Sequence, residues 1–165
     1  TSNRMKVRIR WYGNTFGDIV QPVLEYKIKK GLLGKKMSYS LNAFRLDQSF
    51  DKTQILKATN ENAVPRQVQE ELLSLKPMLL NSYTRKYFLS ADKKFRITID
   101  HHLRYYGIRQ MSNTFSNKNA DHRSTVLELK YDASHETEAK ELSTQFPFTL
   151  TKSSKYLQGL ERIYI

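Results

Sequence analysis

Four short stretches of the chain alternate charged and apolar residues. The alternation is strictest over residues 4–11 and 24–29, and it recurs over residues 95–100 and 127–131. Side chains alternate across a β-strand, so each stretch places its charges on one face and large apolar groups on the other. The pattern therefore predicts several amphipathic strands whose charged faces are mostly basic.

Strands are expected to dominate the rest of the chain as well. The expected strands cover residues 4–12, 22–30, 35–40, 82–90, 94–101, 103–110 and 125–131. Turn-forming residues join the first two strands as antiparallel neighbours through residues 13–18, and residues 91–94 read as a hairpin turn. The polar residues 112–124 predict a loop.

Helices are expected in the middle and at the end of the chain. The clearest begins at Pro65 and ends or bends at Pro77; its apolar face consists of Val68, Leu72, Leu75 and Leu79. Residues 41–63 are ambiguous, with a short helix near Asp51, and further helices are expected over residues 135–144 and from Ser153 or Ser154. The expected class is α+β, with residues 1–165 as a single domain.

Composition adds an anionic partner to this picture. The chain has 28 Lys and Arg against 16 Asp and Glu, a formal net charge of +12. Such an excess favours binding to nucleic acid, a phosphate-rich metabolite or anionic lipid, although a merely soluble basic surface remains an alternative. The absence of Cys excludes disulfides, thiolate metal sites and a Cys nucleophile. No apolar run is long enough to span a membrane.

The charges on the first expected strand indicate which kind of anion the chain could bind. Arg4, Lys6, Arg8 and Arg10 share one face at spacings of about 7 Å and repel one another unless water or an anion compensates them. A curved or closed sheet could line its interior with these groups and focus the field on a bound phosphate chain. Glu25 and Glu128 lie among such cations either as ion-pair partners or as ligands of a divalent metal.

Six motifs, in this order along the chain, resemble the VTC domain. They are Lys6–Tyr12, Leu24–Lys27, Tyr83–Tyr87, Arg96–Asp100, Leu127–Tyr131 and Ser154–Tyr156. The VTC domain is the catalytic domain of the vacuolar transporter chaperone polyphosphate polymerase, has many bacterial relatives, and belongs to the triphosphate tunnel metalloenzymes. The resemblance implies a barrel-like antiparallel β-tunnel with a charged interior and flanking helices. It also implies that the γ-phosphate of ATP is transferred onto polyphosphate with a divalent metal, Mn²⁺ or Mg²⁺.

The resemblance implies a role for ten residues. The implied phosphate-binding residues are Arg8, Arg10, Lys27, Lys36, Tyr83, Arg85, Arg96, Ser154 and Lys155, and the implied metal ligand is Glu128. Of these, the residues implied in catalysis are Arg8, Arg10, Lys27, Arg85, Arg96 and Glu128. From the residues alone, Arg85 and Arg96 could be surface cations, Tyr83 ordinary packing, and Ser154 only a helix cap beside a solvated Lys155.

The same resemblance implies the partners of the chain and an N-terminal segment that the chain lacks. The expected partners are ATP and polyphosphate, without nucleic acid, together with a membrane-protein partner or another subunit and a cytoplasmic location. Family members begin with a further charged strand, so the chain, expected to be a bacterial member, is expected to lack an N-terminal segment. Alternatives are a tunnel-type triphosphatase, a non-catalytic polyphosphate or nucleotide-binding module, and a nucleic-acid-binding domain. Acidic residues on the same strand faces (Glu25, Asp100 and Glu128) argue against the last of these.

Overall fold

The chain folds into two compact units. The first comprises residues 1–78 and 108–115, and the second comprises residues 79–107 and 116–165. The computed structural model describes residues 4–30, 33–59, 63–110 and 112–165. Strands and helices occur in both units, so the expected α+β class is confirmed.

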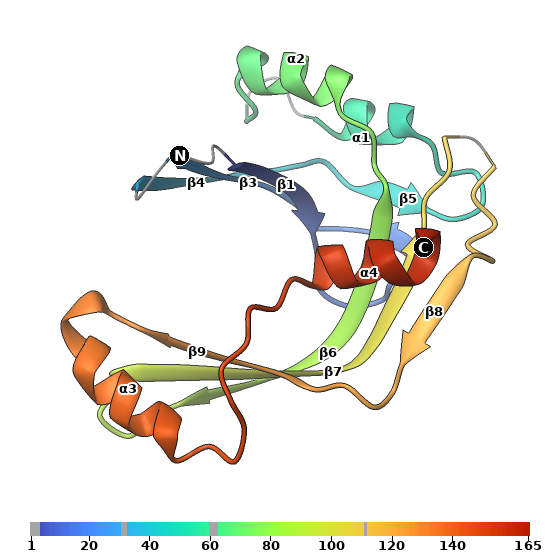
Figure 1. Ribbon diagram of the computed structural model, residues 1–165. Coiled ribbons are helices and arrows are strands. Elements are labelled where there is room, and N and C mark those ends of the chain that lie inside the picture. Colours follow the sequence, from blue (N-terminus) through green and yellow to red (C-terminus); the bar gives the residue numbers. More distant parts are fainter. Residues whose placement is uncertain (1–3, 31–32, 60–62, 111) are drawn as a thin grey trace. The chain divides into compact units, whose positions relative to one another are not determined.

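The first unit consists of an antiparallel sheet, a two-stranded ribbon and a pair of helices (Figure 1). Its elements are β1 (Arg4–Arg10), β2 (Gly17–Ile19), β3 (Val23–Lys30), β4 (Leu33–Ser40), β5 (Phe44–Leu46), α1 (Lys52–Ala58) and α2 (Arg66–Ser74). The sheet has the order β1-β3-β4, and β2 pairs with β5. The expected antiparallel pairing of residues 4–12 with residues 22–30 is confirmed, with Arg8 opposite Glu25.

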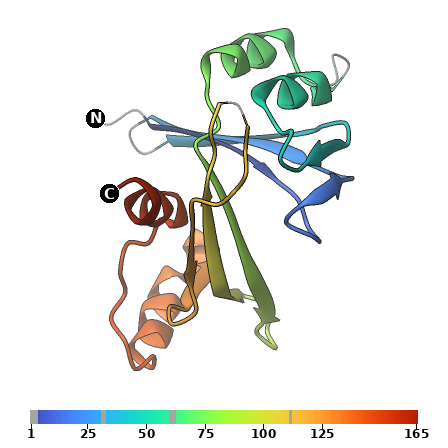
Figure 2. The ribbon, with the colours of Figure 1, turned by 90° about the vertical axis from the view of Figure 1, so that its right-hand side faces the viewer.

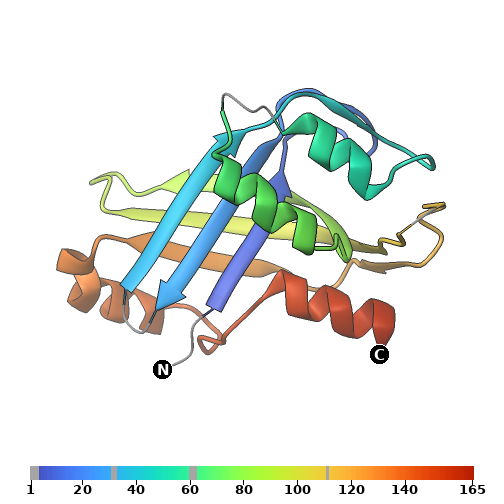
Figure 3. The same ribbon diagram turned by 90° about the horizontal axis from the view of Figure 1, so that it is seen from above.

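The core of the first unit lies between the β1-β3-β4 sheet and its helices. Leu24 and Tyr26 are fully buried and pack in one cluster with Val68 and Leu72 of α2. Figure 3 shows α2 (green) lying across the strands of this sheet. Because α2 covers the apolar face, the alternating cations of β1 and β3 are left on the opposite face.

The second unit is built around one long central strand. Its elements are β6 (Leu79–Leu89), β7 (Phe95–Gly107), β8 (Lys118–Asp121), β9 (Val126–Tyr131), the 3₁₀ turn η1 (Ala133–His135), α3 (Glu136–Thr144) and α4 (Lys155–Tyr164). β7 pairs with β6 along one edge and with β8 and β9 along the other, all antiparallel. Lys94 in the β6–β7 turn forms an ion pair with Glu138 of α3, which ties this helix (orange in Figure 2) to the end of the hairpin.

A β-bulge in β7 changes which side chains share a face. The pairing steps from Thr84–His101 to Ser82–Arg104, and His102 adopts a left-handed backbone with φ of 53°. The extra residue shifts the alternation by one. As a result Asp100, before the bulge, and Tyr105, after it, both face α4.

α4 packs closely on the β6–β9 sheet at Gly159. A Cβ atom at this position would contact Leu79 Cδ2 and lie 2.6 Å from Tyr105 Cδ1. Only glycine therefore allows the helix to approach this closely. The close approach fixes the first turn of α4, which carries Lys155, over the sheet (Figure 1).

Three expectations about the fold are corrected, and one ambiguous stretch is assigned. The helix from Pro65 does not extend to Leu79: α2 ends at Ser74, and β6 begins at Leu79 beyond Pro77. The separate strands expected at residues 94–101 and 103–110 are one bulged strand, β7. Residues 112–124 are not all loop, because they include β8. In the ambiguous stretch 41–63 the short helix expected near Asp51 is confirmed as α1, and β5 precedes it. Residues 60–62 lie outside the described residues.

The expected β-tunnel requires a sheet that closes on itself. In the described part of the chain the strands form three separate sheets, and none of these closes into a barrel. The closed β-tunnel therefore stays a prediction, whereas antiparallel sheets with flanking helices are confirmed. Within the described ranges, no helix has the length and apolar character needed to cross a membrane.

Candidate functional site

One face of the β1-β3-β4 sheet is strongly basic. Its exposed cations, called here the basic face, are Lys6, Arg8, Arg10, Lys27, Lys29 and Lys36. The four predicted residues of this unit thus share one surface, and the register places Lys6, Lys27 and Lys36 in a row across three strands. Neighbouring strands are about 4.8 Å apart, so these ammonium groups repel one another strongly unless an anion lies among them.

Glu25 lies at the centre of the basic face and is only 3% exposed. Its carboxylate is 2.6 Å from Arg8 Nη2, 3.1 Å from Arg10 Nε and 3.1 Å from Lys36 Nζ. Although Oε1 lacks a well-directed hydrogen bond within the described residues, two of these cations lie within ion-pair distance of it. Burial acts to raise the pKa of Glu25, but Arg8, Lys36 and Arg10 outweigh it and lower the pKa.

The sequence left two roles open for Glu25, and the structure shows the ion-pair role. One carboxylate cannot neutralise six cations, so the basic face keeps a clear positive excess. Arg8, Arg10 and Lys36 are held in place by Glu25, whereas Lys27 points from the same strand with its side chain exposed.

The second unit carries a more buried cluster around Asp100, called here the Asp100 cluster: Asp100, Arg85, Lys155 and Tyr83. Asp100 is completely buried. Arg85 donates two hydrogen bonds to it, from Nε to Oδ1 at 2.5 Å and from Nη2 to Oδ2 at 2.7 Å, and Lys155 Nζ lies 2.6 Å from Oδ2. Strand β6, strand β7 and helix α4 each contribute a charged group, so the fold itself brings the cluster together.

Aromatic rings confine the two cations of the Asp100 cluster. The ring centroid of Tyr83 is 5.2 Å from the Arg85 guanidinium carbon and 5.0 Å from Lys155 Nζ, and Tyr87 is 5.8 Å from the same Arg85 carbon. These are distances at which cation–π attraction operates. Tyr83 therefore has a definite structural position between the two cations, beyond general aromatic packing.

Hydrogen bonding within the Asp100 cluster stabilises the charged forms of Asp100 and Arg85. Burial acts to raise the pKa of Asp100, but hydrogen bonds from Arg85 and Lys155 outweigh it and lower the pKa. The same hydrogen bonds to Asp100 raise the pKa of Arg85. With two cations and one carboxylate, the cluster keeps one net positive charge on oriented donors, which suits a phosphate group.

Arg96 and Glu128 lie further along the same face of the β6–β9 sheet. The register places Thr98 between Tyr87 and Glu128, and Arg96 beside Lys130. Arg96 is exposed. Glu128 Oε1 lies 3.5 Å from Lys130 Nζ, so this carboxylate has an ion-pair partner and also faces solvent.

Glu128 is the candidate protein ligand for a divalent metal. No group of three or more His, Cys, Asp or Glu side chains suited to a metal occurs within the described ranges. Asp100 is occupied by Arg85 and Lys155, which leaves Glu128 as the nearby exposed carboxylate of this face. A single carboxylate matches Mg²⁺ or Mn²⁺ that takes its other ligands from phosphate oxygens and water, and does not match a preformed protein cage.

Ser154 has a clear structural function. Its side chain caps α4 and accepts a hydrogen bond from the Leu157 backbone N–H at 3.5 Å. This cap fixes the start of the helix and thereby the position of Lys155. A phosphate contact from Ser154 itself stays a prediction.

Sequence reasoning assigned no role to Asp100, although a signal was available. A hairpin turn at residues 91–94 pairs residues whose numbers sum to 185, and Arg85 with Asp100 is such a pair. The contribution of Lys155 could not be derived in this way, because α4 is distant in sequence from the hairpin. The cations of the basic face on β1 and β3, including Lys6 and Lys29, follow from alternation within each strand. Lys36 does not, because Lys35 precedes it and only the pairing of β3 with β4 shows which of the two lies on this face.

The fold and the two sites define an α+β protein with antiparallel sheets that carry oriented Arg and Lys side chains around buried carboxylates. The family model of the VTC domain matches residues 1–164. The chain therefore belongs to the VTC domain family, which is associated with polyphosphate and phosphotransfer and is generally metal-dependent. A comparison with curated proteins gave no match.

Proposed function

We propose that the chain is a metal-dependent polyphosphate polymerase domain, which transfers the γ-phosphate of ATP onto a polyphosphate chain and releases ADP. The observation that carries this proposal is the Asp100 cluster, where a buried carboxylate orients Arg85 and Lys155 without neutralising both. Family membership supports the same reaction class. The basic face supplies further cations in the first unit, suited to a phosphate chain.

The chemistry needs little from the protein beyond position and charge. A terminal phosphate oxygen of the chain attacks the γ-phosphorus, a new P–O bond forms, and the bond to the bridging oxygen of ADP breaks. The attacking oxygen is already anionic, so no general base is needed. In this proposal Arg85, Arg96 and Lys155 bind phosphate oxygens and offset the repulsion between the two anions.

A divalent metal completes the proposed site. Glu128 would hold Mn²⁺ or Mg²⁺, which when bound neutralises part of the phosphate charge. In the first unit Arg8, Arg10, Lys27 and Lys36 bind phosphates of the substrate or the product. Tyr83 positions the cations of the Asp100 cluster, and Ser154 positions Lys155.

The reaction is tested by incubating the chain with ATP and Mn²⁺ and separating the products by chain length. A ladder of polyphosphates is expected, and Glu128→Gln should lower turnover about a hundredfold. Glu141→Gln removes a carboxylate from the exposed surface of α3 and should leave turnover unchanged. Release of phosphate without a ladder would identify a triphosphatase instead. Anion binding without turnover, insensitive to Glu128→Gln, would identify a binding module.

A membrane-protein partner, another subunit, a cytoplasmic location and the single-domain organisation stay predictions. Nucleic acid remains the main competing partner for so basic a chain. Competition between RNA and short polyphosphate at fixed salt separates the two, because salt-dependent backbone binding alone would show no preference for the phosphate chain.

A further inference from the structure

A shallow pocket lies on the face of β7 and β8 that points away from the Asp100 cluster. It has a volume of about 530 Å³ and is lined by Arg104, Tyr106, Lys118, Asn119 and Ala120. Its position follows from the bulge at His102: Tyr105 faces α4, so Arg104 and Tyr106 face the other way. The register places Ala120 opposite Arg104 and Lys118 opposite Tyr106, which puts them on this second face too.

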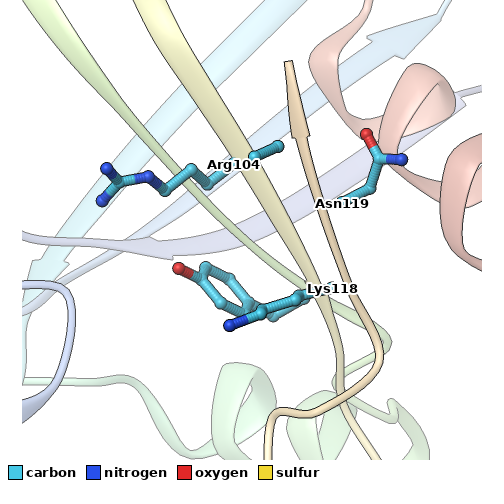
Figure 4. Close-up of a pocket in the computed structure, with 5 residues that line it drawn as sticks. Arg104, Lys118 and Asn119 are labelled. Carbon is cyan, nitrogen blue, oxygen red and sulfur yellow. The ribbon is translucent and has the colours of Figure 1, made fainter. Parts of the chain in front are cut away.

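Two cations converge on this pocket. Figure 4 shows the side chains of Arg104 and Lys118 extending to the same side of the ribbon, whereas Asn119 points away from them. They come from diagonal positions on adjacent strands, about 7–8 Å apart at the backbone. Ala120 places only a methyl group beside Arg104, and this small side chain leaves the hollow open.

Within the part of the chain that the structure describes, the side chains of Arg104 and Lys118 form no ion pair or hydrogen bond with the protein. The nearest acid on β8, Asp121, is buried on the α4 side and bound to Arg162 Nη2 at 2.6 Å. The cations of the Asp100 cluster share a buried carboxylate, so this pocket differs from that cluster in leaving both of its charges available.

We propose that this pocket binds a phosphate group of an inorganic phosphate chain or of a nucleotide, at a site separate from the reaction site. The Arg104 guanidinium matches two phosphate oxygens with its fork, and Lys118 supplies a mobile charge for a third or for the next phosphate. The inference rests on this pocket alone and does not depend on the proposed polymerase activity. Strand β7 then carries phosphate-binding side chains on both of its faces.

The test is a titration of the isotopically labelled full chain, followed by NMR at constant ionic strength. Orthophosphate, tripolyphosphate and ATP are added in separate experiments. Saturable shifts are expected at the backbone amides of residues 104–106 and 118–120 and at Arg104 Nε–H. Saturation at a lower concentration of tripolyphosphate than of ATP identifies the inorganic chain as the source, and the reverse order identifies the nucleotide.

Matched variants separate this pocket from the Asp100 cluster. Arg104→Gln with Lys118→Gln should weaken binding at these amides at least tenfold, whereas Lys86→Gln with Lys76→Gln removes the same charge elsewhere and should not. Lys155→Gln should leave the shifts intact. Ala120→Glu provides a second test that does not depend on the folding of the double variant. It keeps both cations but places a carboxylate between them, and it should abolish binding.

Three results would overturn the proposal. One is shifts at these amides that follow ionic strength without saturating. Another is the loss of the shifts at these amides in Lys155→Gln, because the shifts would then be a remote effect of binding at the Asp100 cluster. The third is binding of RNA at this surface in the absence of any response to the three phosphates.

Discussion

Asp100 and Glu25 are the residues on which the two cation clusters depend. Each is an acid in a basic neighbourhood, each is buried, and each binds more than one cation. Such a carboxylate lowers the affinity of its partners for a second anion, but it also fixes their direction before any ligand arrives. Orientation of this kind reduces the side-chain entropy that binding would otherwise cost.

The lowered pKa values of these acids give a pH-dependent prediction for Asp100→Asn. At pH 7 the substitution should lower the free energy of unfolding by about 3 kcal/mol, because it leaves a buried set of charges unbalanced. The folded-state pKa of Asp100 lies below its ordinary value of 3.8, so the unfolded state binds more protons between the two values. The stabilisation is thus complete above about pH 5 and is lost as the pH falls through the folded-state pKa.

Urea unfolding of the wild type and of Asp100→Asn at several pH values between about 7 and 3 measures this effect. The difference between the two proteins should shrink as the pH falls, since protonation removes the same charge from the wild type. Glu141→Gln should change stability by less than about 0.5 kcal/mol at every pH. A difference between wild type and Asp100→Asn that stays constant down to the lowest pH would contradict the role given to the charge.

At the scale of elements, the hairpin was predictable and the bulge was not. The turn at residues 91–94 is visible in the sequence and fixes the pairing of Arg85 with Asp100. The left-handed residue His102 carries no such signal, because glycine and asparagine are the residues that usually mark this conformation. β8 was missed for a related reason: Lys118–Asp121 has no large apolar residue to alternate with its polar ones.

The close approach of α4 to the sheet leads to a prediction for Gly159→Ala. The added methyl group would collide with Leu79 and Tyr105, which are packed between the helix and the strands. The helix must then shift outward, at a cost of about 1–3 kcal/mol in the free energy of unfolding. Because Lys155 is in the first turn of the same helix, its contact with Asp100 should weaken and tripolyphosphate affinity should fall as well.

Urea unfolding and calorimetric titration with tripolyphosphate measure the two effects of Gly159→Ala. Gly34→Ala is the matched control, since a Cβ there meets only the Ile28 carbonyl oxygen, at 3.8 Å. That control should be neutral or slightly stabilising. If Gly159→Ala lowered stability but left tripolyphosphate affinity unchanged, α4 would not position Lys155 for the ligand.

At the scale of the whole molecule, the family and the α+β class predicted from the sequence are confirmed, whereas the closed tunnel stays a prediction. Alternation within a strand shows which side chains share a face, as it does for Arg8 and Arg10. It contains no information on how the edges of separate sheets meet. The net charge of +12 likewise predicts an anionic ligand without saying which unit binds it.

A thermal-shift experiment with tripolyphosphate tests which of the two units binds phosphate. Tripolyphosphate at about 100 times its dissociation constant should stabilise the folded chain by about 2.7 kcal/mol. For a protein of this size that corresponds to a rise of about 5–10 °C in the unfolding temperature. Sodium sulfate at the same ionic strength serves as the control for general screening of the basic surface.

One exposed cation from each unit then shows where the ligand is held. In a background that carries Arg104→Gln and Lys118→Gln, Lys27→Gln in the first unit and Arg96→Gln in the second should each weaken binding about tenfold, as expected for a charge-assisted hydrogen bond. The same tripolyphosphate concentration would then stabilise each variant by only about 1.4 kcal/mol, so the temperature shift should fall by about half. Lys57→Gln, on α1, should keep the full shift. If Lys27→Gln or Arg96→Gln also kept the full shift, the substituted residue would not contact the ligand, contrary to the role proposed for it.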